Sequence, residues 1–118
     1  DPDYADVFDP LNTARIGAGV AIEKHTGYRG KYETSEATAE YTAFIRKIMN
    51  QNNIVWQTGG MGKVDVGGGG TIAVQLARLN MDIVDFGVPL LSMHAPFEIA
   101  SKADIYSAYL AYKAFFEN

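Results

Sequence analysis

The sequence predicts an α/β domain with a mainly parallel sheet flanked by helices. Short runs rich in β-branched and aromatic residues lie at 20–24 (VAIEK), 54–57 (IVWQ) and 82–86 (DIVDF). Between them, apolar residues recur every three or four positions, as they do in amphipathic helices. Strands that alternate with such helices usually build a parallel sheet. Ligands then bind in the loops that follow the carboxyl ends of the strands.

Composition excludes several classes of protein. The 118 residues carry a formal net charge of −4, so no nucleic acid and no anionic membrane is expected as a partner. No apolar run approaches the ~18 residues of a membrane span, and no signal peptide opens the chain. The sequence has no cysteine, which excludes disulfides and thiolate metal sites. We expect a soluble protein of the cytoplasm.

The first half of the chain contains a predicted strand between two loops, followed by a helix. Residues 1–17 hold two prolines and scattered aspartates without periodicity, which indicates a loop. After the first strand, the polar segment 25–35 has two glycines and two tyrosines and is expected to be a second loop. Thr34 or Ser35 is the predicted N-cap of a helix that ends at the Asn and Gln residues from position 50 onward. The predicted core face of this helix is Ala37, Tyr41, Phe44, Ile45, Ile48 and Met49.

Four consecutive glycines, residues 67–70, begin the second half. Thr71 is the predicted N-cap of a helix over 71–80, with Ile72, Leu76 and Leu79 on its core stripe. The strand at 82–86 ends at Gly87, and residues 88–93 are expected to continue as a second extended run.

The last predicted element is a long helix. Ser101 is its predicted N-cap, with Asp104 three residues on as a variant of the capping box. Its predicted buried face is Ile105, Ala108, Tyr109, Tyr112, Phe115 and Phe116.

The four glycines have two interpretations. Glycine allows positive φ and lets a ligand approach backbone N–H groups, which can hold an anion at a helix start. Alternatively, the glycines only form a tight turn that leads into the helix. The pattern is not a phosphate-binding motif, because no Lys-Ser/Thr follows and GGGGT is not GxGxxG.

His94 is the best-placed candidate for chemistry, at the predicted end of an extended run. Histidine is the commonest metal ligand and the usual acid–base group near neutral pH. A single histidine without an HxxxH or HxD partner is, however, also typical of a core or surface position. Glu98 either orients the ring or is solvated, and His25 has a weaker claim. The other candidate ligands are Asp65, Asp82 and Asp85.

Two long stretches resemble the aspartyl aminopeptidase and vacuolar aminopeptidase I family of zinc metallopeptidases. They are GGGGTIA (67–73) and NMDIVDFGVPLLSMHAPFEIASKADIYSAYLAYKAFF (80–116). GAGVAIEK (17–24) and HTGYRGKYETSEA (25–37) are also similar to that family. The resemblance covers essentially the whole chain and matches the C-terminal end of the family's sequences.

The resemblance implies a C-terminal piece of a zinc-exopeptidase-like (phosphorylase/hydrolase-like) α/β/α catalytic domain, with residues 1–118 as a single segment of it. His94 would bind one ion of a two-zinc site, and Gly68, Gly69, Gly70 and Thr71 would line the peptide substrate. The family's His-x-Asp and Glu-Glu motifs are missing, and so is its general base. The rest of the domain would therefore lie upstream, and no catalytic residue is assigned here. Family members also form large homo-oligomers.

Three hypotheses remain. The chain is the C-terminal segment of a zinc aminopeptidase and inactive by itself, since one histidine cannot hold two metals. Alternatively, it is a non-catalytic binding or assembly module of the same fold. The third and weaker alternative is a phosphate-binding α/β domain that uses residues 67–70.

Overall fold

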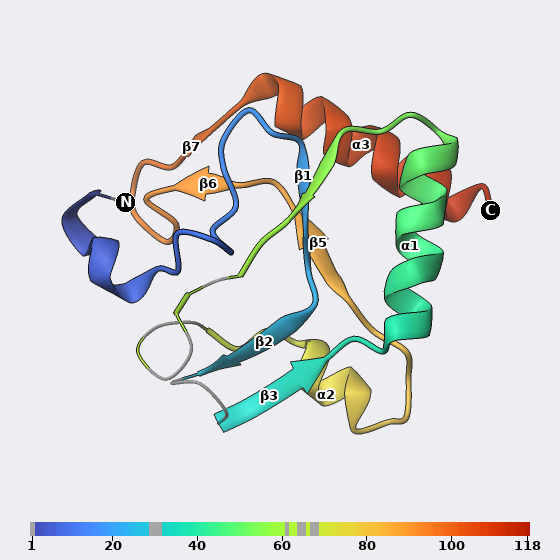
Figure 1. The fold of residues 1–118 in the computed structure, drawn as a ribbon, viewed down its shortest axis with the longest axis horizontal. Coiled ribbons are helices and arrows are strands. Elements are labelled where there is room, and N and C mark those ends of the chain that lie inside the picture. The colour runs from blue at the N-terminus through green and yellow to red at the C-terminus, as the bar shows by residue number, and fades with distance from the viewer. Residues whose placement is uncertain (1, 29–31, 61, 64–65, 67–68) are drawn as a thin grey trace.

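The computed structural model describes residues 2–28, 32–60, 62, 63, 66 and 69–118, and Figure 1 shows its elements. Its largest sheet has the order β4-β1-β5, with β1 (Val20–Glu23) in the centre, β4 (Trp56–Thr58) on one side and β5 (Asp85–Gly87) on the other. Helices and strands are both present, so the predicted α/β class is confirmed.

The predicted parallel arrangement is not confirmed. β1 is parallel to β4 but antiparallel to β5, and the remaining described pairs are antiparallel as well. The reason lies in the position of α2 (Ala73–Ala77), the helix that precedes β5. It packs beside β3, near the C-terminal end of β1 (Figure 1). The chain therefore enters β5 at that end and runs antiparallel to β1.

The polar segment 25–35 was predicted as a loop, which is wrong for its two ends. β2 (His25–Tyr28) and β3 (Tyr32–Glu36) form an antiparallel pair whose register shifts between Thr26 and Tyr28. Thr26 is buried, and its hydroxyl lies 3.0 Å from that of Ser35. Gly27 and the irregular register interrupt the alternation by which a strand is identified in a sequence. Lys24 donates to Glu36 over 2.7 Å and thereby lowers the pKa of that carboxyl.

Helix α1 (Ala39–Gln51) starts later than predicted. Thr34 and Ser35 belong to β3, and Thr38 is the N-cap, its hydroxyl accepting the N–H of Tyr41. The predicted burial of Ile45, Ile48 and Met49 is confirmed, whereas Phe44 is exposed.

Helix α2 is also shorter than predicted. It buries Ala73 and Val74, and Ile72 and Leu79 of the expected stripe are exposed. Its N-cap is Ile72 and not Thr71, although the Thr71 hydroxyl accepts the N–H of Ala73. In residues 1–17, where a loop was predicted, Pro2–Val7 form a 3-10 helix.

Helix α3 (Lys102–Phe116) has the predicted N-cap, since the Ser101 hydroxyl accepts the N–H of Ala103. Its predicted buried face is wrong for Ile105, Tyr109, Tyr112 and Phe116, which are exposed, whereas Ala108 is buried and Phe115 packs half-buried against the core. The side turned inward consists instead of small residues and one carboxylate: Asp104, Ser107, Ala108, Ala111 and Ala114.

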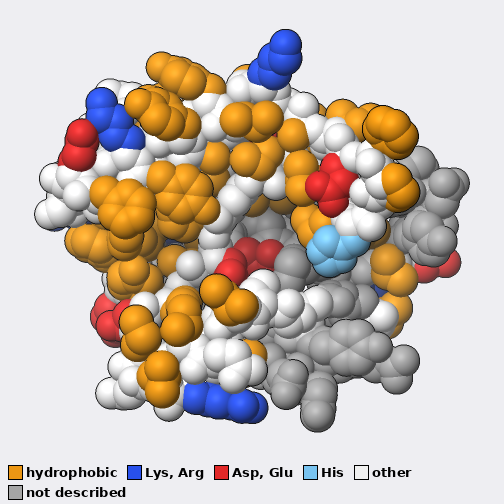
Figure 2. All heavy atoms as spheres, turned by 180° about the vertical axis from the view of Figure 1, so that it is seen from behind, with side chains coloured by type: hydrophobic (Ala, Val, Ile, Leu, Met, Phe, Trp, Pro, Cys, Tyr) orange, Lys and Arg blue, Asp and Glu red, His pale blue; other side chains and the backbone are white. Residues whose placement is uncertain are grey.

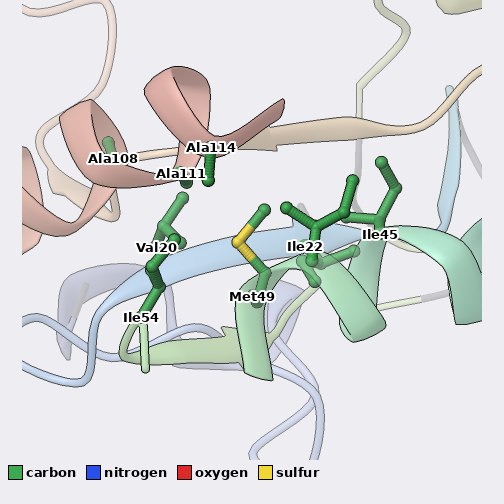
Figure 3. Packing of buried hydrophobic residues seen from close by; sticks show 9 residues of the cluster. Val20, Ile22, Ile45, Met49, Ile54, Ala108, Ala111 and Ala114 are labelled. Atoms are coloured by element: carbon green, nitrogen blue, oxygen red, sulfur yellow. The ribbon is translucent and has the colours of Figure 1, made fainter. Parts of the chain in front are cut away.

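The core lies between β1 and the two long helices. Figure 3 shows Val20 and Ile22 of β1 meeting the alanines of α3 and the larger side chains Ile45 and Met49 of α1. Alanines let α3 approach the sheet closely, which explains why most of its aromatic residues face outward.

The last two strands are β6 (Leu90–Leu91) and β7 (Ile99–Ala100), which pair antiparallel. The extended run that was predicted to reach Met93 therefore ends at Leu91. The turn that joins these two strands carries His94.

Candidate functional site

His94 lies on the turn 92–98 between β6 and β7, and not at the end of a long strand. Its backbone has φ 67°, in the left-handed region, and Ser92 has φ 57°. The His94 N–H donates to a carboxylate oxygen of Glu98 over 2.5 Å, and the Ala95 N–H donates to the Ser92 carbonyl over 2.9 Å. The His94 side chain is exposed, so its imidazole is presented to the outside of this chain.

The described residues do not form a metal site by themselves. No group of three or more His, Asp or Glu side chains that could hold a metal ion occurs within the described part of the chain. Asp82 accepts a hydrogen bond from Thr38, and Asp85 accepts one from Thr71, so both carboxylates are tied to other elements. Asp65 lies outside the described residues. A tetrahedral zinc site takes at least three protein ligands, so the described residues can supply only part of one.

The glycine segment is anchored on both sides. The Gly69 carbonyl accepts the N–H of Gly27 in β2 over 3.0 Å. The Thr71 hydroxyl donates to Asp85 of β5 over 2.9 Å and accepts the Ala73 N–H over 3.1 Å. Gly70 is exposed, and a Cβ added there would meet open space. Gly68 lies outside the described residues, so the predicted substrate-lining set can be placed only from Gly69 to Thr71.

This arrangement disfavours the phosphate-binding alternative. Helix α2 begins two residues after Thr71 and is only five residues long. The Thr71 hydroxyl is engaged by the carboxylate of Asp85, which places an acidic group beside the start of α2. A phosphate there would meet a carboxylate with no cationic partner supplied by the motif.

Two side chains have roles that the sequence did not predict. Glu98 was expected to orient the imidazole or to be solvated, and it accepts the backbone N–H of His94 instead. Asp104 was assigned to the cap of α3. It is 1% exposed and accepts the N–H groups of Gly17 (2.7 Å) and Gly19 (2.8 Å) in the loop before β1. No short-range sequence motif predicts these three bonds. Asp104 is more than 80 residues from Gly17 and Gly19, and the bond between His94 and Glu98 depends on the conformation of the turn.

Within the part of the chain that the structure describes, no helix combines the length and the apolar character that crossing a bilayer requires.

Comparison with known proteins identifies the family. A family model described as "Aminopeptidase I zinc metalloprotease (M18)" matches residues 1–116. The "Probable M18 family aminopeptidase 1" of Thermotoga maritima is 50% identical over 116 residues, which are 98% of this chain and 26% of that protein. The crystal structure of the M18 aminopeptidase from Thermotoga maritima matches with a TM-score of 0.89 at 50% identity, over 97% of this chain and 25% of the other.

A second solved structure agrees. That of aminopeptidase I from Clostridium acetobutylicum matches with a TM-score of 0.91 at 49% identity, over 100% of this chain and 26% of the other. The chain thus spans about a quarter of the length of these relatives. Sequence and fold agree along nearly its whole length, so the chain belongs to the aminopeptidase I zinc metalloprotease (M18) family.

Proposed function

We propose that these 118 residues are a C-terminal segment of the catalytic domain of a zinc aminopeptidase, and that His94 is one ligand of its metal site. The observation that carries the proposal is an exposed histidine held on a left-handed turn, in a chain that belongs to a zinc metalloprotease family. Strained backbone on an exposed polar residue is typical of functional sites. The remaining ligands and the general base would come from the part of the protein outside residues 1–118.

Zinc, bound as one of two ions in the complete protein, would polarise the scissile carbonyl and lower the pKa of a bound water. This chain would supply one imidazole ligand to the metal and part of the surface that contacts the substrate. The exposed Gly70, its half-buried neighbour Gly69 and the anchored Thr71 would lie against the peptide, since glycine allows a ligand to approach the main chain. The isolated chain is expected to be inactive. Assembly into a homo-oligomer and a place in the cytoplasm remain predictions from the sequence.

A chimera tests the role of His94. Residues 1–118 would replace the matching quarter of the Thermotoga maritima relative, and zinc content and release of N-terminal residues from peptides would be measured. We expect His94→Ala to lower activity by more than about 100-fold, because loss of even an outer-shell partner of a metal costs about 10–100-fold.

The matched control is His25→Ala, which removes the other histidine of the chain. Its activity and zinc content are expected to stay near those of the unsubstituted chimera. Full activity and full zinc content in His94→Ala would contradict the assignment. Turnover by the isolated 118-residue chain at the level of the chimera would contradict the proposal that the site is completed elsewhere.

The outer side of α3 supports the view that this chain is part of a larger domain. Figure 2 shows large hydrophobic side chains gathered on one face of the molecule. The exposed apolar residues of α3, called here the aromatic face, are Ile105, Tyr106, Tyr109, Tyr112 and Phe116. Tyr112 also stacks on Phe86 of β5 at 4.6 Å and donates to its carbonyl, so the face continues onto a strand at the edge of the described sheet.

A helix of a soluble domain normally turns its large apolar residues inward. α3 turns alanines inward and most of its aromatics outward, so a second layer of protein is needed to cover the aromatic face. In the relatives, the part outside the match is about three times as long as this chain, which is enough to supply that layer.

Tyr109→Lys tests whether the aromatic face is covered. In the isolated chain Tyr109 is 58% exposed, so the lysine is expected to change the free energy of unfolding by less than about 0.5 kcal/mol. In the chimera we expect a loss of about 2 kcal/mol or more, because a covered lysine is an unpaired buried charge. Urea denaturation of both proteins gives the comparison, with the isolated chain as internal control. Equal effects in both contexts would show that nothing covers this face.

A further inference from the structure

The turn between β6 and β7 holds two non-glycine residues in the left-handed region. Ser92 has φ 57° and His94 has φ 67°. Side chains with a Cβ are disfavoured there, because the Cβ comes close to backbone oxygen. Such conformations persist only where other contacts enforce them. The turn must therefore contain interactions that compensate for this strain.

Packing does not provide the compensation. Every residue from Leu91 to Ile99 is exposed, and the strands on either side pair over only two residues each. Among the described residues, two hydrogen bonds lie inside the turn. One joins the Ala95 N–H to the Ser92 carbonyl, and the other joins the His94 N–H to the Glu98 carboxylate. The second is charge-assisted, which makes it the stronger kind of bond.

The hydrogen bond to Glu98 is made by His94, the residue whose side-chain direction matters for the proposed function. It fixes the peptide N–H of His94, and the orientation of that peptide group sets the direction in which the side chain leaves the backbone. The carboxylate engages the backbone and not the ring, and among the described residues the imidazole has no hydrogen-bond partner. Both ring nitrogens therefore stay available for a ligand outside this chain.

We propose that Glu98 is a positioning residue for His94: its carboxylate holds the backbone N–H of His94 and keeps the imidazole directed out of the turn. The inference rests on the proposed function, because the direction of the ring matters for activity only if the ring binds something. It adds to that function a residue that makes no contact with metal or substrate itself.

Three variants separate positioning from general stability. Glu98→Ala removes the acceptor, Glu98→Gln keeps a side-chain oxygen that can accept the same N–H, and Glu117→Ala removes an exposed glutamate far from the turn in sequence. In the chimera, amide hydrogen exchange at His94 and the affinity for zinc are measured. We expect Glu98→Ala to speed exchange of the His94 amide by roughly 10-fold or more and to weaken zinc binding about 10–100-fold.

Glu98→Gln is expected to recover most of both properties, and Glu117→Ala to change neither. Exchange at Ile48 and Ala111 in the core should stay slow in all three, which excludes unfolding as the cause. Unchanged exchange of the His94 amide in Glu98→Ala would overturn the proposal. So would unchanged zinc affinity in Glu98→Ala while His94→Ala loses zinc. If His94→Ala keeps its zinc, the proposed metal role fails instead, and the exchange data alone then decide whether Glu98 holds the turn.

Discussion

Replacing Asp104 by alanine is expected to lower the free energy of unfolding by about 3 kcal/mol or more, since each hydrogen bond to a charged group contributes about 1.5–3 kcal/mol. Asp104 is 1% exposed, and its two oxygens accept the N–H groups of Gly17 and Gly19. These bonds join the first turn of α3 to the loop that leads into β1, across more than 80 residues of sequence. Alanine would leave the N–H of the buried Gly19 without a partner and a void beside it, whereas Gly17 is exposed and its N–H can bind water.

Urea denaturation of the purified chain measures this loss. Asp104→Asn keeps one carbonyl oxygen and should fall between the wild type and alanine, because it can accept one of the two bonds. Asp82→Ala is the control, since Asp82 is exposed and accepts only a 3.3 Å bond from Thr38. It is expected to cost less than about 0.5 kcal/mol. A loss in Asp104→Ala no larger than in Asp82→Ala would contradict the role assigned to this carboxylate.

The sequence predicts best those elements whose pattern is long and regular. The sequence predicted the two long helices α1 and α3, the strand β1 and the cap at Ser101, because periodicity and capping are local properties. The pair of β2 and β3 was missed. Its strands are short and polar, and a glycine interrupts one of them, so the pairing depends on contacts between segments.

The inward side of α3 shows a second limit. Apolar periodicity marks two stripes on this helix, one of alanines and one of aromatics, and hydrophobicity favours the aromatic stripe as the core. The chain buries the alanines where α3 meets α1 and β1, and of the aromatic residues Phe115 packs half-buried against this core. Which stripe is buried depends on the distance between helix and sheet, which a sequence pattern does not contain. The aromatic stripe would be buried as well only in a larger domain.

For the site, residue types alone gave His94 a modest claim, and the family resemblance raised it. The left-handed turn and the role of Glu98 came only from the structure. Neither Ser92 nor His94 indicates positive φ as strongly as the glycines at positions 17 and 19 do. An unfavourable local conformation cannot be inferred from local preferences, since it exists only because other bonds enforce it.

The second large effect on stability is expected at Gly19, in the loop that Asp104 holds. Gly19 has φ 92°, and a Cβ built there would overlap the carbonyl carbon and oxygen of Val55. Val55 is fixed because its carbonyl also accepts the N–H of Val20 at the start of β1. Backbone atoms in a paired segment cannot move aside cheaply. Gly19→Ala is therefore expected to cost about 3 kcal/mol or more, from left-handed strain and overpacking together.

Gly17→Ala is the matched control, because it lies two residues away with a similar φ of 87° and nothing within 4 Å of the added Cβ. It should cost only the strain of a left-handed alanine, about 1–2 kcal/mol. Both glycines donate to Asp104, so any loss of those bonds is shared, and the difference between the variants isolates the overlap with Val55. Urea midpoints of the two variants measure that difference. Equal losses would show that Val55 and the entry to β1 shift to make room, and that close packing at Gly19 does not limit the stability of the central strand.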